Sequence, residues 1–156
     1  MRAVKRAAAQ AAFAAVVTFV VVASGDAPPD QYVTFGAQAA QIQDNYTNLV
    51  WQRVVAQTPT DHFGAQDACV KNGQRLPTYR ELLTIVDEDP HDEWDPEAGA
   101  GTPRYIDPNA FPGTPAGPFW TMSPAPGGGF KVVDFGTGET SGQTLTAFYR
   151  CVVDVP

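Results

Sequence analysis

The densest group of chemically active side chains is the acidic stretch DEDPHDEWDPE, residues 87–97, which holds seven carboxylates in eleven residues. Hard cations such as Ca²⁺ bind several carboxylate oxygens, so an ordered calcium loop is one interpretation. The spacing does not match an EF-hand, however, and two prolines interrupt the stretch. The favoured interpretation is a solvated acidic insertion, and an ordered calcium site is the alternative.

The two histidines, His62 and His91, are the other candidates for acid–base chemistry. Neither has a recognisable serine or cysteine partner for nucleophilic catalysis. His62 falls near a predicted helix start, where a solvated or capping role is expected. The glycine-rich Asp134–Gly138 precedes neither a helix nor a Lys-Ser/Thr pair, so it does not indicate a phosphate-binding loop. We therefore predict no catalytic, cofactor-binding or metal-ligating residues and a protein that is not an enzyme.

Cys69 and Cys151 are the two cysteines of the sequence. In an exported protein an even number favours one disulfide. It would close a loop of about 80 residues, for which the chain-entropy model gives at most about 4–5 kcal/mol. Two buried free thiols are the alternative. A metal site is disfavoured, because there is no CxxC and no histidine at ligand spacing.

The N-terminal sequence predicts export. A basic opening, MRAVKR, leads into the apolar run AAFAAVVTFVVVAS, Ala11–Ser24, and then into the proline-containing DAPPDQ. The run is long for the apolar core of a signal peptide but short for a membrane span of about 20 residues. We predict a cleaved signal peptide at residues 1–25, with an uncleaved anchor as the alternative. With this export signal the protein is secreted, periplasmic or on the cell surface. It contacts the membrane only if the signal segment stays uncleaved.

The remaining chain, about 130 residues, has the size of one domain. The net charge of −7 falls to about −10 when the three cations of the signal peptide are removed. Such an acidic surface argues against nucleic acid as a partner, because phosphate binding depends on basic clusters. Fourteen glycines and fourteen prolines indicate short elements and long loops.

Hydrophobic patterns predict the elements that position these residues. Residues 26–38 resemble an irregular leader ahead of a domain at 39–156, and residues 99–129 are expected to be irregular as well. Strands are expected around Ile42 and over Leu49–Val55, paired as a hairpin through the turn residues 44–48. Further strands are expected over Phe130–Phe135 and, closing a C-terminal hairpin, over Thr144–Val155. Helices are expected within Thr58–Gly73 and over Tyr79–Val86. This order indicates an α+β domain.

Both helices carry start signals. Thr60 or Asp61 is expected to cap the first, with Phe63, Ala68 and Cys69 toward one side. The second lies in GQRLPTYRELLTIVD, residues 73–87, which we call the signature segment. There Thr78 and Glu81 have the spacing of a capping box. The buried stripe is expected to comprise Leu82, Leu83, Ile85 and Val86.

Five pieces of the sequence resemble one family. DNYTNLVWQR, ACVKNGQRLPTYRELLTIVD, YIDPNAFPGTPAGPFWTMSP, VVDFGTGETSG and FYRCVVD occur in the order typical of the Lcl C-terminal domain family, also called DUF 1566. The resemblance covers residues 41–154. Gln74 departs from the pattern, which usually has tryptophan before Arg-Leu-Pro, and residues 88–103 look like an insertion.

The resemblance implies a fold. The RLPT segment followed by glutamate, with a late Arg-Cys, is also similar to the sulfatase-modifying-factor superfamily, whose enzymes include the formylglycine-generating enzymes. Both groups imply a C-type-lectin-like fold, in which a disulfide between the first helix and the last strand would pair Cys69 with Cys151. The resemblance further implies that Arg75-Leu76-Pro77 fixes how the chain enters the second helix, with Arg75 paired internally.

The leading functional hypothesis is a secreted or cell-surface binding and adhesion module that recognises an extracellular glycan or a protein partner. Loops at residues 88–129 would carry the contacts, with Trp94, Tyr105 and Trp120 as candidate aromatics. Phe119 and Trp120 also match core-like positions of the family, so burial is the favoured interpretation for both. The alternatives are an assembly subunit of a surface complex and, less favoured, an enzyme of the formylglycine-generating type.

Overall fold

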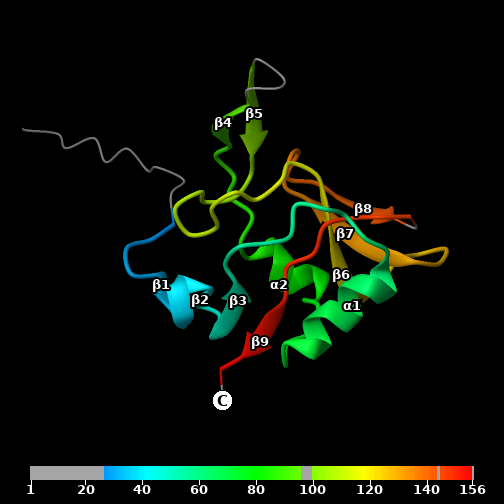
Figure 1. Ribbon diagram of the computed structural model, residues 1–156. Coiled ribbons are helices and arrows are strands. Elements are labelled where there is room, and N and C mark those ends of the chain that lie inside the picture. Colours follow the sequence, from blue (N-terminus) through cyan, green and yellow to red (C-terminus); the bar gives the residue numbers. More distant parts are fainter. Residues whose placement is uncertain (1–26, 96–99, 144, 156) are drawn as a thin grey trace, which may run out of the picture.

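A computed structural model describes residues 27–95, 100–143 and 145–155 (Figure 1). The predicted signal peptide and Glu97 of the acidic stretch lie outside these ranges. Within them, none of the helices combines the length and the apolar character needed to span a bilayer. The described chain forms small antiparallel sheets with two short α-helices, which agrees with the predicted α+β class.

The largest sheet brings together strands from both ends of the described chain. In the order β1-β2-β3-β9 its strands are β1 (Tyr32–Phe35), β2 (Gln41–Asp44), β3 (Leu49–Gln52) and β9 (Val152–Asp154), each antiparallel to its neighbours. The register places Ile42 opposite Trp51, and Trp51 opposite Val152. All three side chains are buried. Because side chains alternate along a strand, this row marks the face of the sheet that packs on the core.

This sheet corrects two expectations. Residues 26–38 are not wholly irregular, because they contain β1 and the start of the 3₁₀ turn η1 (Ala37–Ala39). Tyr32 in β1 packs edge-on against Phe111, with ring centroids 5.2 Å apart, a contact that a local pattern does not reveal. The closing strand is only β9, and it pairs with β3 instead of completing a C-terminal hairpin.

Helix α1 (His62–Lys71) begins and ends where the sequence predicts. The carboxylate of Asp61 caps its start by accepting a hydrogen bond from a first-turn amide at 2.8 Å. Gly73, at φ 67°, turns the chain after the last residues of the helix in the left-handed conformation that suits glycine. The expected apolar face is partly wrong, because Phe63 is 71% exposed while Cys69 is buried.

Helix α2 (Tyr79–Leu83) is shorter than the predicted span of Tyr79–Val86. Its capping box is confirmed: Thr78 Oγ1 accepts from Glu81 N at 3.2 Å, and the Glu81 carboxylate accepts from Thr78 N at 2.7 Å. The next three amides bond to carbonyls three residues back instead of four, so the helix continues only as turns. Of the predicted stripe, Leu82 and Ile85 are buried, and Leu83 and Val86 pack at the edge of the core.

A second sheet has the order β6-β7-β8, formed by β6 (Pro118–Pro124), β7 (Phe130–Asp134) and β8 (Thr140–Gln143). Strand β7 was expected, whereas β6 corrects the prediction that residues 99–129 are irregular. Phe119 and Trp120 of β6 are 0% and 1% exposed, so this strand contributes large side chains to the core. Prolines and glycines on both sides obscure the strand in the sequence.

The acidic stretch leads into a two-stranded hairpin, β4 (His91–Asp95) and β5 (Ala100–Arg104). His91 pairs with Arg104 at its base, and Asp95 pairs with Ala100 toward its end. In Figure 1 this hairpin stands away from the sheets and helices of the rest of the domain. The insertion is therefore a paired ribbon over these residues, which composition alone did not indicate.

The disulfide between Cys69 and Cys151 is present, with the Cα atoms 5.4 Å apart and a sequence separation of 82. It joins α1 to the residue just before β9, the pairing that the family resemblance implies. Both cysteines are 0% exposed and lie in a core cluster with Leu76, Trp120 and Val132. A larger cluster beneath the first sheet contains Trp51, Phe111 and Phe119 among others.

Replacing both cysteines by alanine should reduce the free energy of unfolding by about 2–5 kcal/mol, because the crosslink restricts the unfolded chain and fills a buried site. Urea denaturation of the oxidised wild-type protein and the double variant measures this difference. Non-reducing mass spectrometry that finds two free thiols in the wild-type protein would contradict the crosslink itself.

Candidate functional site

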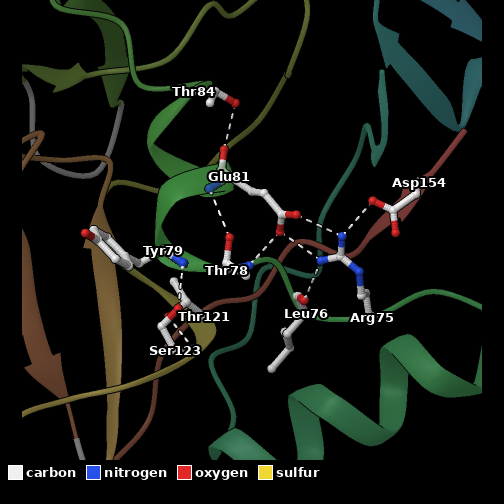
Figure 2. A network of polar contacts seen from close by, with 9 residues as sticks. All are labelled: Arg75, Leu76, Thr78, Tyr79, Glu81, Thr84, Thr121, Ser123 and Asp154. Atoms are coloured by element: carbon white, nitrogen blue, oxygen red, sulfur yellow. Dashed lines mark hydrogen bonds and ion pairs between the residues drawn. The ribbon is translucent and has the colours of Figure 1, made fainter. Parts of the chain in front are cut away.

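The signature segment follows α1, contains α2 and contacts β9 (Figure 2). The Arg75 guanidinium donates two hydrogen bonds to the Glu81 carboxylate, at 2.8 and 2.9 Å, and a third to Asp154 Oδ1 at 2.9 Å. The backbones of Arg75 and Val152 exchange two further hydrogen bonds of 2.9 Å each. The segment is therefore attached to β9 through both its backbone and its arginine.

The start of α2 is also attached to β6. Pro77 O accepts a hydrogen bond from Met122 N at 2.8 Å. Tyr79 N donates to Ser123 Oγ at 3.0 Å, and Figure 2 shows this hydroxyl directly beneath the first turn of the helix. With the capping box, the bond from Tyr79 N satisfies amides that a helix start otherwise leaves without partners.

The electrostatics of this network are those of a structural ion pair. The hydrogen bond to Glu81 raises the pKa of Arg75 above its usual value, although burial acts in the opposite direction. For Glu81, burial raises the pKa, but the bonds from Arg75 and Thr78 outweigh burial and leave the pKa below its usual range. Both groups are charged at neutral pH and have no proton to exchange there, so this network is not suited to acid–base catalysis.

Arg150 is a fully buried arginine beside the disulfide. Its guanidinium donates to the carbonyls of Gln52 and Arg53 and to the hydroxyl of Thr114, and it lies 4.6 Å from the centroid of the Phe111 ring. Burial lowers the pKa of Arg150 to about 9, so the group still carries its charge at neutral pH. Arg150, the arginine of the Arg-Cys pair near the C-terminus, thus holds the end of β3 and the loop before β6 together.

His62 is buried, which corrects the expectation of a solvated or capping residue. Its ring stacks on Phe130 with centroids 3.3 Å apart and planes 2° from parallel, and Nε2 lies 3.0 Å from Thr121 O. Because a carbonyl only accepts, Nε2 carries the proton. Burial lowers the pKa of His62, which favours this neutral form. His62 therefore packs α1 against β6 and β7.

The acidic stretch begins with a buried carboxylate. Asp87 is 9% exposed; its Oδ2 lies 3.0 Å from His91 Nε2, and its Oδ1 accepts from Asp89 N at 3.0 Å. Over the part of the chain that the structure describes, no three Asp, Glu, His or Cys side chains are arranged to hold a metal ion. The side chains of residues 93–97 lie outside the described ones.

The three candidate aromatics lie on different elements. Trp94 is in the hairpin strand β4, opposite Gly101, and its side chain is outside the described ones. Tyr105 follows β5, is half-buried and lies over Gly138. Trp120 has the core position that the family resemblance favoured, which corrects only its place among the contact candidates: it is 1% exposed and its indole donates to Thr60 O at 2.8 Å. Its size and amphipathic ring suggested a contact residue, but the structure uses both properties in the core.

Sequence reasoning missed a cleft of about 530 Å³ between η1, β2, the end of β3 and the end of α1. We call it the amide cleft, because five of its seven lining residues carry side-chain amides. It is lined by Gln38, Ala40, Gln41, Gln52, Val54, Asn72 and Gln74. These positions form no local motif, so their only signal in the sequence is that several glutamines occur at the ends of elements.

Together, the α+β architecture, the disulfide and the Arg75–Glu81 pair define a small crosslinked domain whose signature residues serve the fold. The chain belongs to the Lcl C-terminal domain family, whose model matches residues 40–153. No curated protein and no solved structure matches the chain.

Glu81→Gln should lower the free energy of unfolding at pH 7 by about 1–3 kcal/mol, because it weakens charged hydrogen bonds to Arg75 and the helix start. The folded-state pKa of Glu81 is depressed, so its stabilisation is present above the unfolded pKa of about 4.3 and is lost as pH falls through the folded pKa. Denaturation of the wild-type protein and the variant at pH values from 7 to 3 measures the difference between their free energies of unfolding. This difference should shrink as the pH falls. Glu139→Gln, at an exposed carboxylate, is the matched control, and an equal effect of the two changes would contradict the structural pair.

His62→Gln should flatten the dependence of stability on pH between pH 7 and 5. In the wild-type protein the unfolded chain takes up a proton near pH 6.5, whereas buried His62, with its lowered pKa, resists protonation. Its stabilisation is therefore present above that pH and declines as the pH falls. Thermal unfolding at several pH values measures the slope, and an unchanged slope in the variant would rule out this role.

Proposed function

We propose that the protein is an exported, non-enzymatic binding and adhesion module that contacts an extracellular partner, with a glycan as the candidate ligand. The observation that carries the proposal is the β4–β5 hairpin, which stands away from a body held by the disulfide (Figure 1). Binding residues are often found on loops that a rigid scaffold positions. Residues 88–129 contain this hairpin and fit that arrangement.

A non-enzymatic role is supported by how the reactive side chains are used. His62 is stacked on Phe130, His91 contacts Asp87, and both cysteines are crosslinked. Glu81 is committed to Arg75 and to the start of α2. Each of these groups has a structural partner in place of the free, matched acid and base that catalysis requires.

A C-type-lectin-like arrangement and export are parts of the same proposal. A disulfide from the first helix to the residue just before the last strand supports the fold relationship and is typical of an oxidising compartment. The acidic composition argues against nucleic acid as a partner. Membrane attachment would require the signal segment to remain uncleaved. Calcium is retained as a candidate bridge between the acidic stretch and a charged glycan.

One observation favours the alternative of an assembly subunit. The outer face of the first sheet exposes Val33, Phe35 and Val155, which are 48%, 39% and 37% exposed, and β1 is an edge strand. Exposed apolar strands at a sheet edge are prone to pair with other chains. If this face mediates assembly, sedimentation velocity should detect a complex that Val33→Ser with Phe35→Ser dissolves.

Protein lacking residues 1–25 should bind glycans on an array, and Trp94→Ala or Tyr105→Ala should reduce the signal at least about fivefold by removing contact area. Tyr46→Ala is the matched control, because Tyr46 is a 66% exposed aromatic at the β2–β3 turn. The array is run with Ca²⁺ and with a chelator. A flat array in both conditions, together with a thermal midpoint that Ca²⁺ does not shift, would contradict glycan recognition.

A further inference from the structure

The amide cleft differs from the rest of this acidic protein, because none of its seven described lining residues is ionisable. Its volume of about 530 Å³ falls in the range of small-ligand sites, roughly 300–1,000 Å³. A charged ligand would find no counter-charge among these residues. A neutral ligand that both donates and accepts hydrogen bonds would be matched, because each side-chain amide offers a carbonyl oxygen and two N–H groups.

Most of the hydrogen-bonding capacity of the cleft is unused by the described protein. Gln52 Oε1 accepts from Cys151 N at 3.3 Å, and Asn72 Nδ2 donates to Ala68 O at 3.2 Å. Gln74 Nε2 is shielded from solvent and has no partner among the described residues. Burying an amide without a partner is unfavourable, so a ligand that accepts from Gln74 would relieve that cost.

The backbone holds two of these glutamines in place through the disulfide. Gln52 N donates to Cys151 O at 2.9 Å, and Gln74 N donates to Cys69 O at 3.0 Å. The two crosslinked cysteines therefore each anchor one glutamine of the cleft. A third bond, from Arg53 N to Ala40 O at 3.0 Å, attaches the end of β3 to the residue after η1. The backbone of these residues is therefore already ordered when a ligand binds, which removes backbone ordering from the cost of binding.

We propose that the amide cleft binds a neutral, hydroxyl-rich saccharide unit. Sugar hydroxyls both donate and accept, which matches the amides of Gln41, Gln52 and Gln74. The C–H faces of a sugar ring are apolar, and Val54, which is 54% exposed, offers them a surface at the rim. This inference rests on the proposed function as a glycan-binding module, and it adds a contact site outside loops 88–129.

The test is a titration of uniformly ¹⁵N-labelled protein lacking residues 1–25, followed through the side-chain amide signals of asparagine and glutamine. The probes are neutral gluco-, manno- and galacto-oligosaccharides, a heparin-derived oligosaccharide and an uncharged polar peptide. We expect a neutral oligosaccharide to shift the amide signals of Gln41, Gln52 and Gln74 in a saturable way. Gln74→Leu and Gln41→Leu should each raise the dissociation constant about five- to tenfold, as expected for one lost hydrogen bond.

Gln43→Leu is the matched control, since it makes the same change on β2 at a position that does not line the amide cleft; it should leave the dissociation constant within about twofold. If neutral oligosaccharides shift only signals of the β4–β5 hairpin, the cleft proposal is wrong while the proposed function stands. If only the peptide or only the heparin fragment shifts the cleft amides, the neutral-saccharide assignment is wrong. If no saccharide shifts any signal, both proposals fail.

Discussion

The disulfide between Cys69 and Cys151 is the contact on which the rest of the domain depends, because both cysteines also hold the chain around them. Their carbonyls accept from Gln74 N and Gln52 N, so one covalent bond fixes α1, the end of β3 and the start of the signature segment against each other. A domain of this size with short strands buries limited apolar surface, and a crosslink offsets part of that deficit. Every proposed recognition surface is built on this fixed body.

Two arginines beside the disulfide illustrate different solutions to placing a charge near a core. Arg75 is paired with carboxylates at the surface, which keeps its pKa above the usual value. Arg150 is buried against carbonyl oxygens, a hydroxyl and the ring of Phe111, and burial lowers its pKa. A buried charge tolerates few geometries, so Arg150 restricts how the loop before β6 can pack on β3. Arg75 and Arg150 both belong to the family pattern, and both thus help to specify the fold.

The sequence predicted features that depend on neighbouring residues. The capping box of Thr78 and Glu81, the start of α1 and the pairing of β2 with β3 all follow from local chemistry and alternation. What it did not predict depends on remote contacts. Strand β1 needs the free edge of β2, His62 needs the ring of Phe130, and the amide cleft gathers glutamines from three separate stretches of the chain. Trp120 was ambiguous because a tryptophan suits a core and a binding surface equally well.

We expect the signature segment and the residues around the disulfide to form the most stable part of the domain and to position the proposed binding surfaces. Native-state hydrogen exchange of the oxidised protein, measured residue by residue by NMR, tests it most directly. The backbone amides of Gln52, Arg75 and Val152 should exchange last, with the free energy of global unfolding. If these amides exchange as fast as those of the β4–β5 hairpin, the disulfide-centred body is not the rigid scaffold described, and the claim is wrong.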